Sequence, residues 1–160
     1  MVFTKHDPHA APGFYARCRL EPFARRAFEN GSLESSVLSG VLKLCDRLTR
    51  GEPGLAGPDV PAARLHGDLW SGNVLWSPGS ARLIDPAAHG GHPETDLAML
   101  ALFGLPHLEI VLDAYMRTSP LPDGWRERVA LHQLHPLLVH AALFGGGYGN
   151  QVARIVAHYE

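Results

Sequence analysis

Apolar residues recur in the first third of the chain at spacings that predict helices. Residues 14–30 are Arg-rich with spaced apolar positions, which predicts a helix with a break near Pro22. Residues 1–13 are polar and interrupted by proline and glycine, which predicts a loop or a disordered terminus. A better helix is predicted from Ser32, its expected N-cap, to Leu48, and its apolar face would be formed by Val37, Leu38, Val41, Leu42, Cys45 and Leu48.

The middle and the end of the chain combine short strands with further helices. Residues 97–103 are apolar at every position, which favours a buried helix capped by Asp96 or Thr95. Turn-forming residues at 77–80 join two of the expected strands into a β-hairpin. The strands are predicted at 64–66, 74–76 and 82–84, and the other helices at 107–117, 125–144 and 151–159. The expected fold class is therefore α+β and mostly α-helical.

Composition and charge narrow the classes of partner. With 14 basic and 16 acidic residues, the formal net charge is −2, so neither nucleic acid nor an anionic membrane is an expected partner. No apolar run reaches the roughly 18 to 20 residues of a membrane span, and residues 1–20 lack the apolar core of a secretory signal. Cys18 and Cys45 are isolated, which favours a reducing, cytoplasmic location over a disulfide framework.

Three polar residues around the predicted hairpin carry the candidate chemistry. Asp68 and Asn73 lie on one loop before the hairpin, and Asp85 ends its second arm. Folding the hairpin back would bring two carboxylates and an amide oxygen together, which is a ligand set that suits Mg²⁺. The spacing H-x-D-x-x-x-x-N, with a later Asp, matches the catalytic loop of kinases. In that template Asp68 is the base, and Asn73 and Asp85 bind the metal; the alternative is that all three are ordinary turn and cap residues.

The sequence of this segment resembles that of the fructosamine (ketosamine) kinase family. Residues 65–73 read LHGDLWSGN, including the Trp-Ser-Gly insertion that is similar to the family signature. The likeness continues through 84–104 and into the helices up to about residue 150. It implies the C-terminal lobe of a protein-kinase-like fold over residues 14–160, with the catalytic loop and metal site in 65–87.

The resemblance also implies an activity and roles for single residues. The family transfers the γ-phosphate of ATP to the 3-hydroxyl of a ketosamine, which is a small molecule or a glycated protein amine. Carried over, Asp68 accepts the proton, and Asn73 and Asp85 hold Mg²⁺. His66 and Asp96 would support the catalytic loop, with Asp96 bonding to its backbone. Weaker substrate-site candidates are Trp70 and His140, for which a buried aromatic anchor and a core histidine are the alternatives.

One part of a complete kinase is not recognisable. The ATP-gripping lobe needs a Lys on a strand, but Lys5 lies in a Pro/His-rich loop and Lys43 in a predicted helix. The N-terminal lobe is therefore expected to be absent, and an exposed apolar surface near Trp70 and Trp76 would favour self-association. Alternatives are a non-catalytic binding module, a site completed by a lobe on another chain, or a small-molecule kinase like the aminoglycoside phosphotransferases.

Two further motifs have simple readings. The glycine-rich segment 145–149 follows a helix and carries no Lys, so an interhelical turn is favoured over a phosphate-binding loop. The pairs His89/His92 and His132/His135 have a spacing that could suggest zinc, but no cysteine or third grouped ligand is near in the sequence.

Overall fold

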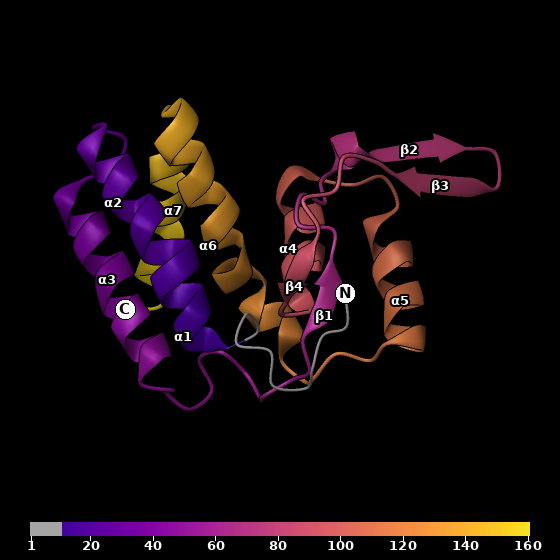
Figure 1. Cartoon of the computed structure of the whole chain (residues 1–160), viewed down its shortest axis with the longest axis horizontal. Coiled ribbons are helices and arrows are strands. Elements are labelled where there is room, and N and C mark those ends of the chain that lie inside the picture. Colours follow the sequence, from indigo (N-terminus) through magenta and orange to yellow (C-terminus); the bar gives the residue numbers. More distant parts are fainter. Residues whose placement is uncertain (1–10) are drawn as a thin grey trace. The chain divides into compact units, whose positions relative to one another are not determined.

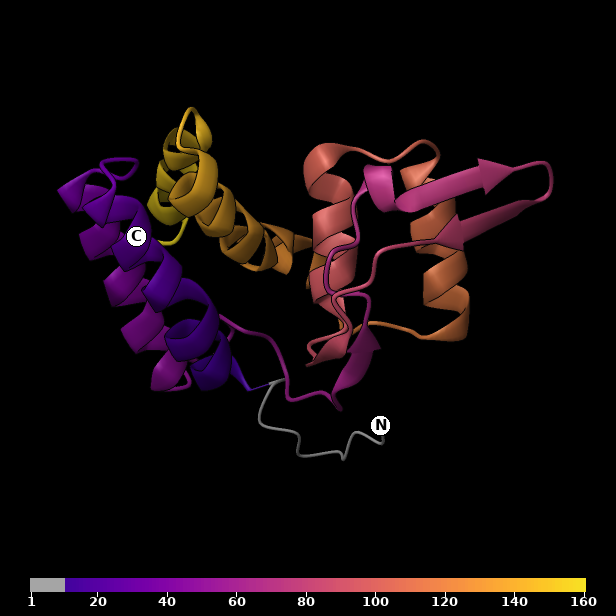
Figure 2. The ribbon, with the colours of Figure 1, turned by 45° about the horizontal axis from the view of Figure 1, so that its top comes forward.

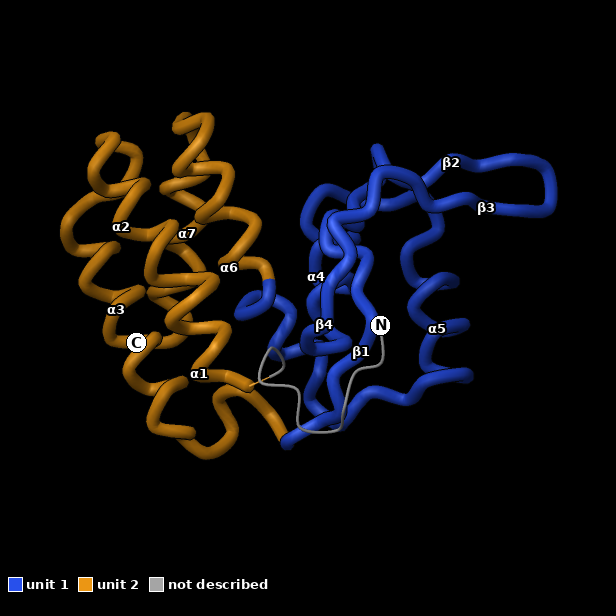
Figure 3. Tube along the Cα trace, viewed as in Figure 1, with its two compact units in different colours: residues 1–10, 59–132 blue, residues 11–58, 133–160 orange. Residues whose placement is uncertain are grey.

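The computed structural model describes residues 11–160 and divides them into two compact units (Figure 3). Unit 1 holds residues 59–132, and unit 2 holds residues 11–58 together with 133–160. The longest helix, α6 (Trp125–Phe144), contributes its first turns to unit 1 and the remainder to unit 2. The expected loop at 1–13 falls mostly outside the described residues, but Pro12–Phe14 already forms the helical turn α1.

Unit 2 is built from helices, as its sequence pattern predicts (Figure 1). A π-helical stretch, Tyr15–Leu20, follows α1 and passes directly into α2 (Glu21–Glu29). The expected break near Pro22 takes the form of this change from π- to α-helix beside the proline, and the chain stays helical through it. The other helices are α3 (Ser35–Thr49), the second part of α6, and α7 (Tyr148–His158), and the glycines between α6 and α7 form the expected turn.

The core of unit 2 lies between these helices. The buried face of α3 includes Val41, Cys45 and Leu48, which agrees with the predicted apolar face. Ser32 does not cap this helix: α3 begins at Ser35, and Glu34 occupies the N-cap position in extended conformation. Apolar residues from the other helices complete the core, among them Ala16, Leu20, Ala24, Leu134, Leu138, Ala141, Val152 and Val156.

Unit 1 carries two small antiparallel sheets among its described residues. The predicted hairpin is confirmed: β2 (Val74–Ser77) pairs with β3 (Ser80–Leu83) from Val74 opposite Leu83 to Ser77 opposite Ser80. The first strand, β1 (Ala63–Leu65), pairs with β4 (His89–Gly91). The sequence pattern does not predict β4, because two of its three residues are glycines, which are unfavourable in strands. This pairing closes the segment 66–88 at its base.

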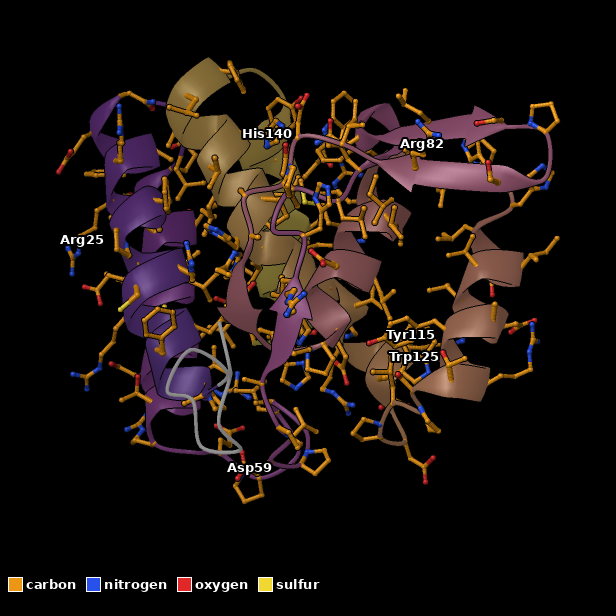
Figure 4. The ribbon with its side chains drawn as sticks, turned by 45° about the vertical axis from the view of Figure 1, so that its right-hand side comes forward. Arg25, Asp59, Arg82, Tyr115, Trp125 and His140 are labelled. Atoms are coloured by element: carbon orange, nitrogen blue, oxygen red, sulfur yellow. The ribbon has the colours of Figure 1, made fainter. Side chains whose placement is uncertain are left out.

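Helices α4 (Glu94–Phe103) and α5 (Leu108–Thr118) complete unit 1 with the start of α6. The buried helix is confirmed, but it starts at Glu94, so Thr95 and Asp96 lie inside its first turn and do not cap it. A core cluster that includes Trp125 joins the helices to the loop region, and Tyr115 packs against it; both residues are labelled in Figure 4. Its buried members are Leu69, Val74, Leu97, Leu100, Leu105, Leu112, Leu121 and Trp125.

The β2–β3 hairpin extends beyond the other elements of unit 1 in both Figure 1 and Figure 2. Every residue of β3 is exposed, and on β2 only Val74 is buried. Large apolar side chains of the hairpin are therefore exposed to solvent: Leu75, Trp76 and Leu83 are about half exposed, at 50%, 49% and 56%. None of the helices in residues 11–160 combines the length and the apolarity that a membrane crossing requires.

Candidate functional site

A direct hydrogen bond joins the first two predicted site residues. The loop after β1 passes through Asp68 and ends in a short 3-10 turn, Ser71–Asn73. The amide nitrogen of Asn73 donates to the Asp68 carboxylate at 2.9 Å and to the Asp68 backbone oxygen at 2.8 Å. Both acceptors are oxygens without a proton, so the nitrogen end of the amide must face Asp68. The Asn73 side chain, which is 7% exposed, is thereby held with its oxygen directed away from Asp68.

His66 connects the same loop to the far arm of the hairpin. Its Nε2 lies 2.9 Å from the backbone oxygen of Ile84, and its Nδ1 lies 3.4 Å from the backbone nitrogen of Asp68. A carbonyl oxygen can only accept, so Nε2 carries the proton and Nδ1 accepts the Asp68 N–H. The imidazole thus contacts a backbone partner on each side, and its predicted support of the loop stays a prediction.

Asp85 directly follows Ile84, whose backbone bonds to both Asn73 and His66. The Ile84 N–H donates to the Asn73 backbone oxygen at 3.1 Å, while the Ile84 oxygen receives the His66 bond. Asp85 itself is exposed and has a left-handed backbone with φ of 52°. Non-glycine residues in that region cost of order 1–3 kcal/mol and are concentrated at functional sites. The backbone thus connects Asn73 to the residue before Asp85, while the convergence of the three side chains stays a prediction.

Asp96 holds the start of the loop from helix α4. Its two carboxylate oxygens accept the backbone N–H groups of His66 at 2.6 Å and Gly67 at 3.0 Å. Such charge-assisted bonds are roughly twice as strong as neutral ones. Gly67 has φ of +83°, and a Cβ there would lie 2.3 Å from the Ala87 backbone oxygen, so the close approach requires glycine. Burial and then the Asp96 charge raise the pKa of Tyr115.

The two weaker candidates lie in different surroundings. Trp70 follows the loop aspartate closely and is 40% exposed, with its ring edge-on to Phe103 at 6.2 Å between centroids. It is therefore neither fully buried nor free of packing. His140 belongs to unit 2, where its Nδ1 lies 2.7 Å from the Pro136 oxygen and its ring packs on Phe144 and Tyr148. These contacts are those of a packed histidine.

A buried polar cluster at the start of α4 was not predicted from the sequence. Glu94 is 1% exposed and receives two bonds from Arg128, from Nε at 3.0 Å and from Nη2 at 2.6 Å. His132 Nε2 lies 3.4 Å from the same carboxylate, and the His132 ring stacks on His92 at 4.7 Å. The only hints in the sequence are the i, i+4 spacing of Arg128 and His132 and the short sequence separation of His92 and Glu94.

The histidine pairs considered for zinc are divided by the fold. His92 and His132 come together with Glu94, and their ligand atoms lie within 4.8 Å of one another. His89 bonds to the Ala87 oxygen instead, and His135 bonds to the Arg19 oxygen in unit 2. The ligand spacing read from the sequence therefore does not describe a single site.

Electrostatics in this cluster favour one pattern of charge. Burial would raise the pKa of Glu94, but hydrogen bonds from His132 and Arg128 hold it at about 2. Burial and the neighbouring His132 lower the pKa of His92 to about 4. Near neutral pH the cluster therefore contains an ionised Glu94 and a neutral His92.

The loop presents groups that suit phosphoryl transfer. A carboxylate, an amide oxygen and a second carboxylate are held on one connected backbone, with no covalent nucleophile required. Oxygen ligands of this kind fit Mg²⁺, which is usually completed by substrate phosphates and water.

Comparisons with known proteins identify relatives over most of the chain. The "Probable ketoamine kinase" of Klebsiella aerogenes is 49% identical over 83% of this chain and 44% of its own length. A probable ketoamine kinase of Enterococcus faecium is 36% identical over 91% of this chain and 52% of its own. The chain thus spans about half the length of the curated relatives it matches.

Solved structures give the same relationship. The crystal structure of a candidate fructosamine-3-kinase from Thermobifida fusca is 50% identical, with a TM-score of 0.85 over 99% of this chain and 55% of that one. A structure from Haemophilus somnus shares the fold with a TM-score of 0.74 at 20% identity. The family model described as fructosamine kinase matches residues 11–159. The chain therefore belongs to the fructosamine kinase family.

Proposed function

We propose that this chain carries the phosphoryl-transfer site of a ketosamine kinase. The reaction moves the γ-phosphate of ATP to the 3-hydroxyl of a ketosamine, either a small molecule or a glycated protein amine. Family membership and the names of the relatives support a kinase that acts on ketoamines. The near-neutral balance of charge also suits a small-molecule partner.

Asp68 is the proposed base, and its bond to Asn73 is the observation that carries the proposal. A catalytic carboxylate must be held within hydrogen-bond reach of the acceptor hydroxyl whose proton it takes. The Asn73 amide donates to Asp68 Oδ2 at 2.9 Å, which fixes the carboxylate without neutralising it. The Asp68 carboxylate would orient the acceptor hydroxyl and take its proton as the phosphoryl group arrives.

Asn73 and Asp85 are the proposed Mg²⁺ ligands. The Asn73 nitrogen is engaged by Asp68, so its Oδ1 is the end available to a cation. Asp85 offers an exposed carboxylate just after Ile84, whose N–H is bonded to Asn73. When bound, Mg²⁺ would neutralise the charge of the ATP phosphates. His66 and Asp96 keep the loop in place, Trp70 would form a wall for the sugar, and His140 remains the weakest substrate candidate.

The test is ATP-dependent phosphorylation of a fructosyl-lysine derivative. It should be run with this chain and with the longest polypeptide of its reading frame, because the relatives are about twice as long. In whichever form is active, Asp68→Ala should reduce the rate by about 100-fold or more, since general-base catalysis contributes that much. Asp59→Ala changes an exposed loop aspartate and is the matched control. A normal rate for Asp68→Ala would contradict the proposed base.

A second candidate function is a binding module without turnover. It is favoured by the position of Lys43, which is the lysine within residues 11–160 and lies exposed on helix α3 rather than on a strand. A kinase uses a strand lysine to hold the ATP phosphates. Calorimetric titration of the 160-residue chain with Mg-ATP separates the two candidates: micromolar binding would count against the module.

A further inference from the structure

The ion pair between Arg128 and Glu94 is deeply buried within unit 1. The two side chains are 8% and 1% exposed and meet through two N–H···O bonds of 3.0 and 2.6 Å. The desolvation cost of such a pair can exceed its attraction, so burial alone does not make it a source of stability. A role in fixing one conformation is the better explanation for its geometry.

The pair is placed where it can act on the catalytic loop. Glu94 is the first residue of α4, and Asp96 lies two positions later in the same turn. Asp96 is the residue that accepts the His66 and Gly67 N–H groups. Arg128 lies on the part of α6 that belongs to unit 1, and its Nη1 also donates to the Asp123 oxygen at 3.1 Å. The guanidinium thus joins α6 and the preceding turn to the start of α4.

Neighbouring groups keep the carboxylate of Glu94 in this position. His132 Nδ1 lies 3.2 Å from the Thr95 hydroxyl, and its Nε2 lies 3.4 Å from Glu94 Oε2. His92 packs on the other side of His132 with an angle of 28° between the rings. The Glu94 backbone N–H donates to His92 Nδ1 at 3.3 Å, so the first residue of α4 is held through both its side chain and its backbone.

We infer that Arg128, acting through Glu94, is a positioning residue for the loop that carries Asp68. It fixes the first turn of α4, and that turn presents the Asp96 carboxylate to the backbone of His66 and Gly67. Arg128 acts through these residues and takes no part in the chemistry. What the loop does rests on the proposed function, but its positioning can be measured without any turnover.

A metal ion held by His92, Glu94 and His132 is the competing explanation for the cluster. Their ligand atoms lie within 4.8 Å of one another, but both oxygens of Glu94 already accept from Arg128. A cation there would also face the positive guanidinium. His92 Nδ1 accepts a backbone N–H, so metal ligation through that atom would break this bond. The arginine fork therefore takes the place that a metal would need.

The test is nuclear magnetic resonance of the amide groups of His66 and Gly67 in the 160-residue chain. Charge-assisted bonds to Asp96 should shift both amide protons downfield and slow their exchange with water. Asp96→Asn gives the signature of a weakened bond. Arg128→Met should reproduce that signature, with exchange of the two amides about tenfold faster relative to the amides of α3. Arg126→Met is the matched control, since it removes an exposed ion pair with Glu109 from the same helix.

Several results would overturn the inference. One is an Arg128→Met chain in which the α3 amides change as much as those of His66 and Gly67, because that would indicate general loss of stability. Another is a chain in which the two loop amides do not move at all. If Arg128→Met does not fold, Arg128→Lys keeps the charge without the fork and should give an intermediate shift; unchanged loop amides would contradict the inference.

Addition of zinc chloride tests the competing explanation, in which the cluster binds a metal ion. The unfolding temperature of the chain should not change on addition of zinc, whereas an increase that His132→Gln abolishes would assign the cluster to a metal and overturn the arginine-based explanation. None of these measurements depends on phosphoryl transfer, so a failure of the proposed function would be seen separately, in the Asp68→Ala assay.

Discussion

The backbone N–H of Ile84 donates to the backbone oxygen of Asn73 at 3.1 Å. This bond lies at the open end of the hairpin, one pair beyond Val74 opposite Leu83. It extends the strand pairing to the residue just before Asp85. The proposed metal ligands are therefore connected through the backbone ladder, independently of any bound ion.

Replacing Asn73 by Asp should disturb the site through charge. The variant would place a second carboxylate against Asp68, where the amide nitrogen now lies 2.9 Å from Oδ2. Two adjacent carboxylates repel and raise the pKa of the pair. Urea unfolding at pH 7 should show a loss of about 1–3 kcal/mol, as expected for a lost buried hydrogen bond. The loss should shrink at lower pH, as one carboxylate takes up a proton.

Asn150→Asp is the control for that change. Asn150 is exposed on α7, so its substitution adds the same charge at a surface position. Equal losses of stability in the two variants would contradict the predicted repulsion between positions 68 and 73.

Gly67 and Gly79 offer a matched pair of substitutions to alanine. Both have positive φ, of +83° and +75°, so alanine costs roughly 1–2 kcal/mol of backbone strain at either position. A Cβ at Gly67 would also lie 2.3 Å from the Ala87 oxygen, whereas one at Gly79 meets nothing within 4 Å. Gly67→Ala should therefore lose about 2–5 kcal/mol in total, since overpacking adds to the strain. Equal unfolding midpoints for the two variants would rule out the close approach at Gly67.

Acid should destabilise the chain through His92. Its folded-state pKa is about 4, because burial and then His132 disfavour the charged ring, against an ordinary value of 6.5. Between these values the unfolded chain binds a proton that the folded chain does not, so stability is lost as pH falls through this window. The loss is on the order of 3 kcal/mol and levels off below the folded pKa. Glu94, with a pKa of about 2, adds a further loss at lower pH, as its carboxylate is protonated first in the unfolded chain.

Chemical unfolding at pH 7, 5.5 and 4.5 measures this dependence. His92→Gln should flatten the curve between the first and last of these points, because the titrating ring is gone. His158→Gln, at an exposed position near the end of α7, should keep the slope of the unchanged chain. A His92→Gln curve as steep as the original would show that another group is responsible.

The exposed apolar side chains of the β2–β3 hairpin should make the chain self-associate. Leu75 and Trp76 on β2 and Leu83 on β3 are about half exposed, at 50%, 49% and 56%. Large apolar side chains that are exposed in this way favour contact with other molecules. Sedimentation velocity at increasing concentration should detect association, and Trp76→Ser should reduce it. Phe144→Ser removes an exposed aromatic ring from unit 2 and is the comparison; a monomeric chain at all concentrations would contradict the prediction.

The sequence predicts best what depends on near neighbours. Asp68 and Asn73 are five residues apart on one loop, and turn chemistry between β2 and β3 forms the hairpin locally. The helices α3 and α6 follow from their apolar patterns. The predicted helix starts were less accurate, at Ser32 for α3 and at Thr95 or Asp96 for α4. Capping preferences do not show which polar side chain binds another partner instead, as Asp96 does with the loop backbone.

Contacts between distant residues could not be predicted in the same way. Glu94 and Arg128 are 34 positions apart, and nothing local marks either of them as buried. The strand β4 consists of His89 and two glycines, and it pairs because β1 lies opposite, not because of strand propensity. The π-helical stretch Tyr15–Leu20 before α2 was not predicted either, because π-helices are rare and have no simple sequence signature.

The register of the β2–β3 hairpin also determines where this chain can change length. Its strands pair in succession from Val74 and Leu83 to Ser77 and Ser80, and its tip is exposed. Equal extensions of both arms would move only the tip outward and leave the Asn73–Ile84 bond in register. An inserted peptide epitope or a fluorophore-binding sequence at Pro78–Gly79 should therefore be carried without displacing Asn73 or Asp85, which makes this tip the natural position for a label.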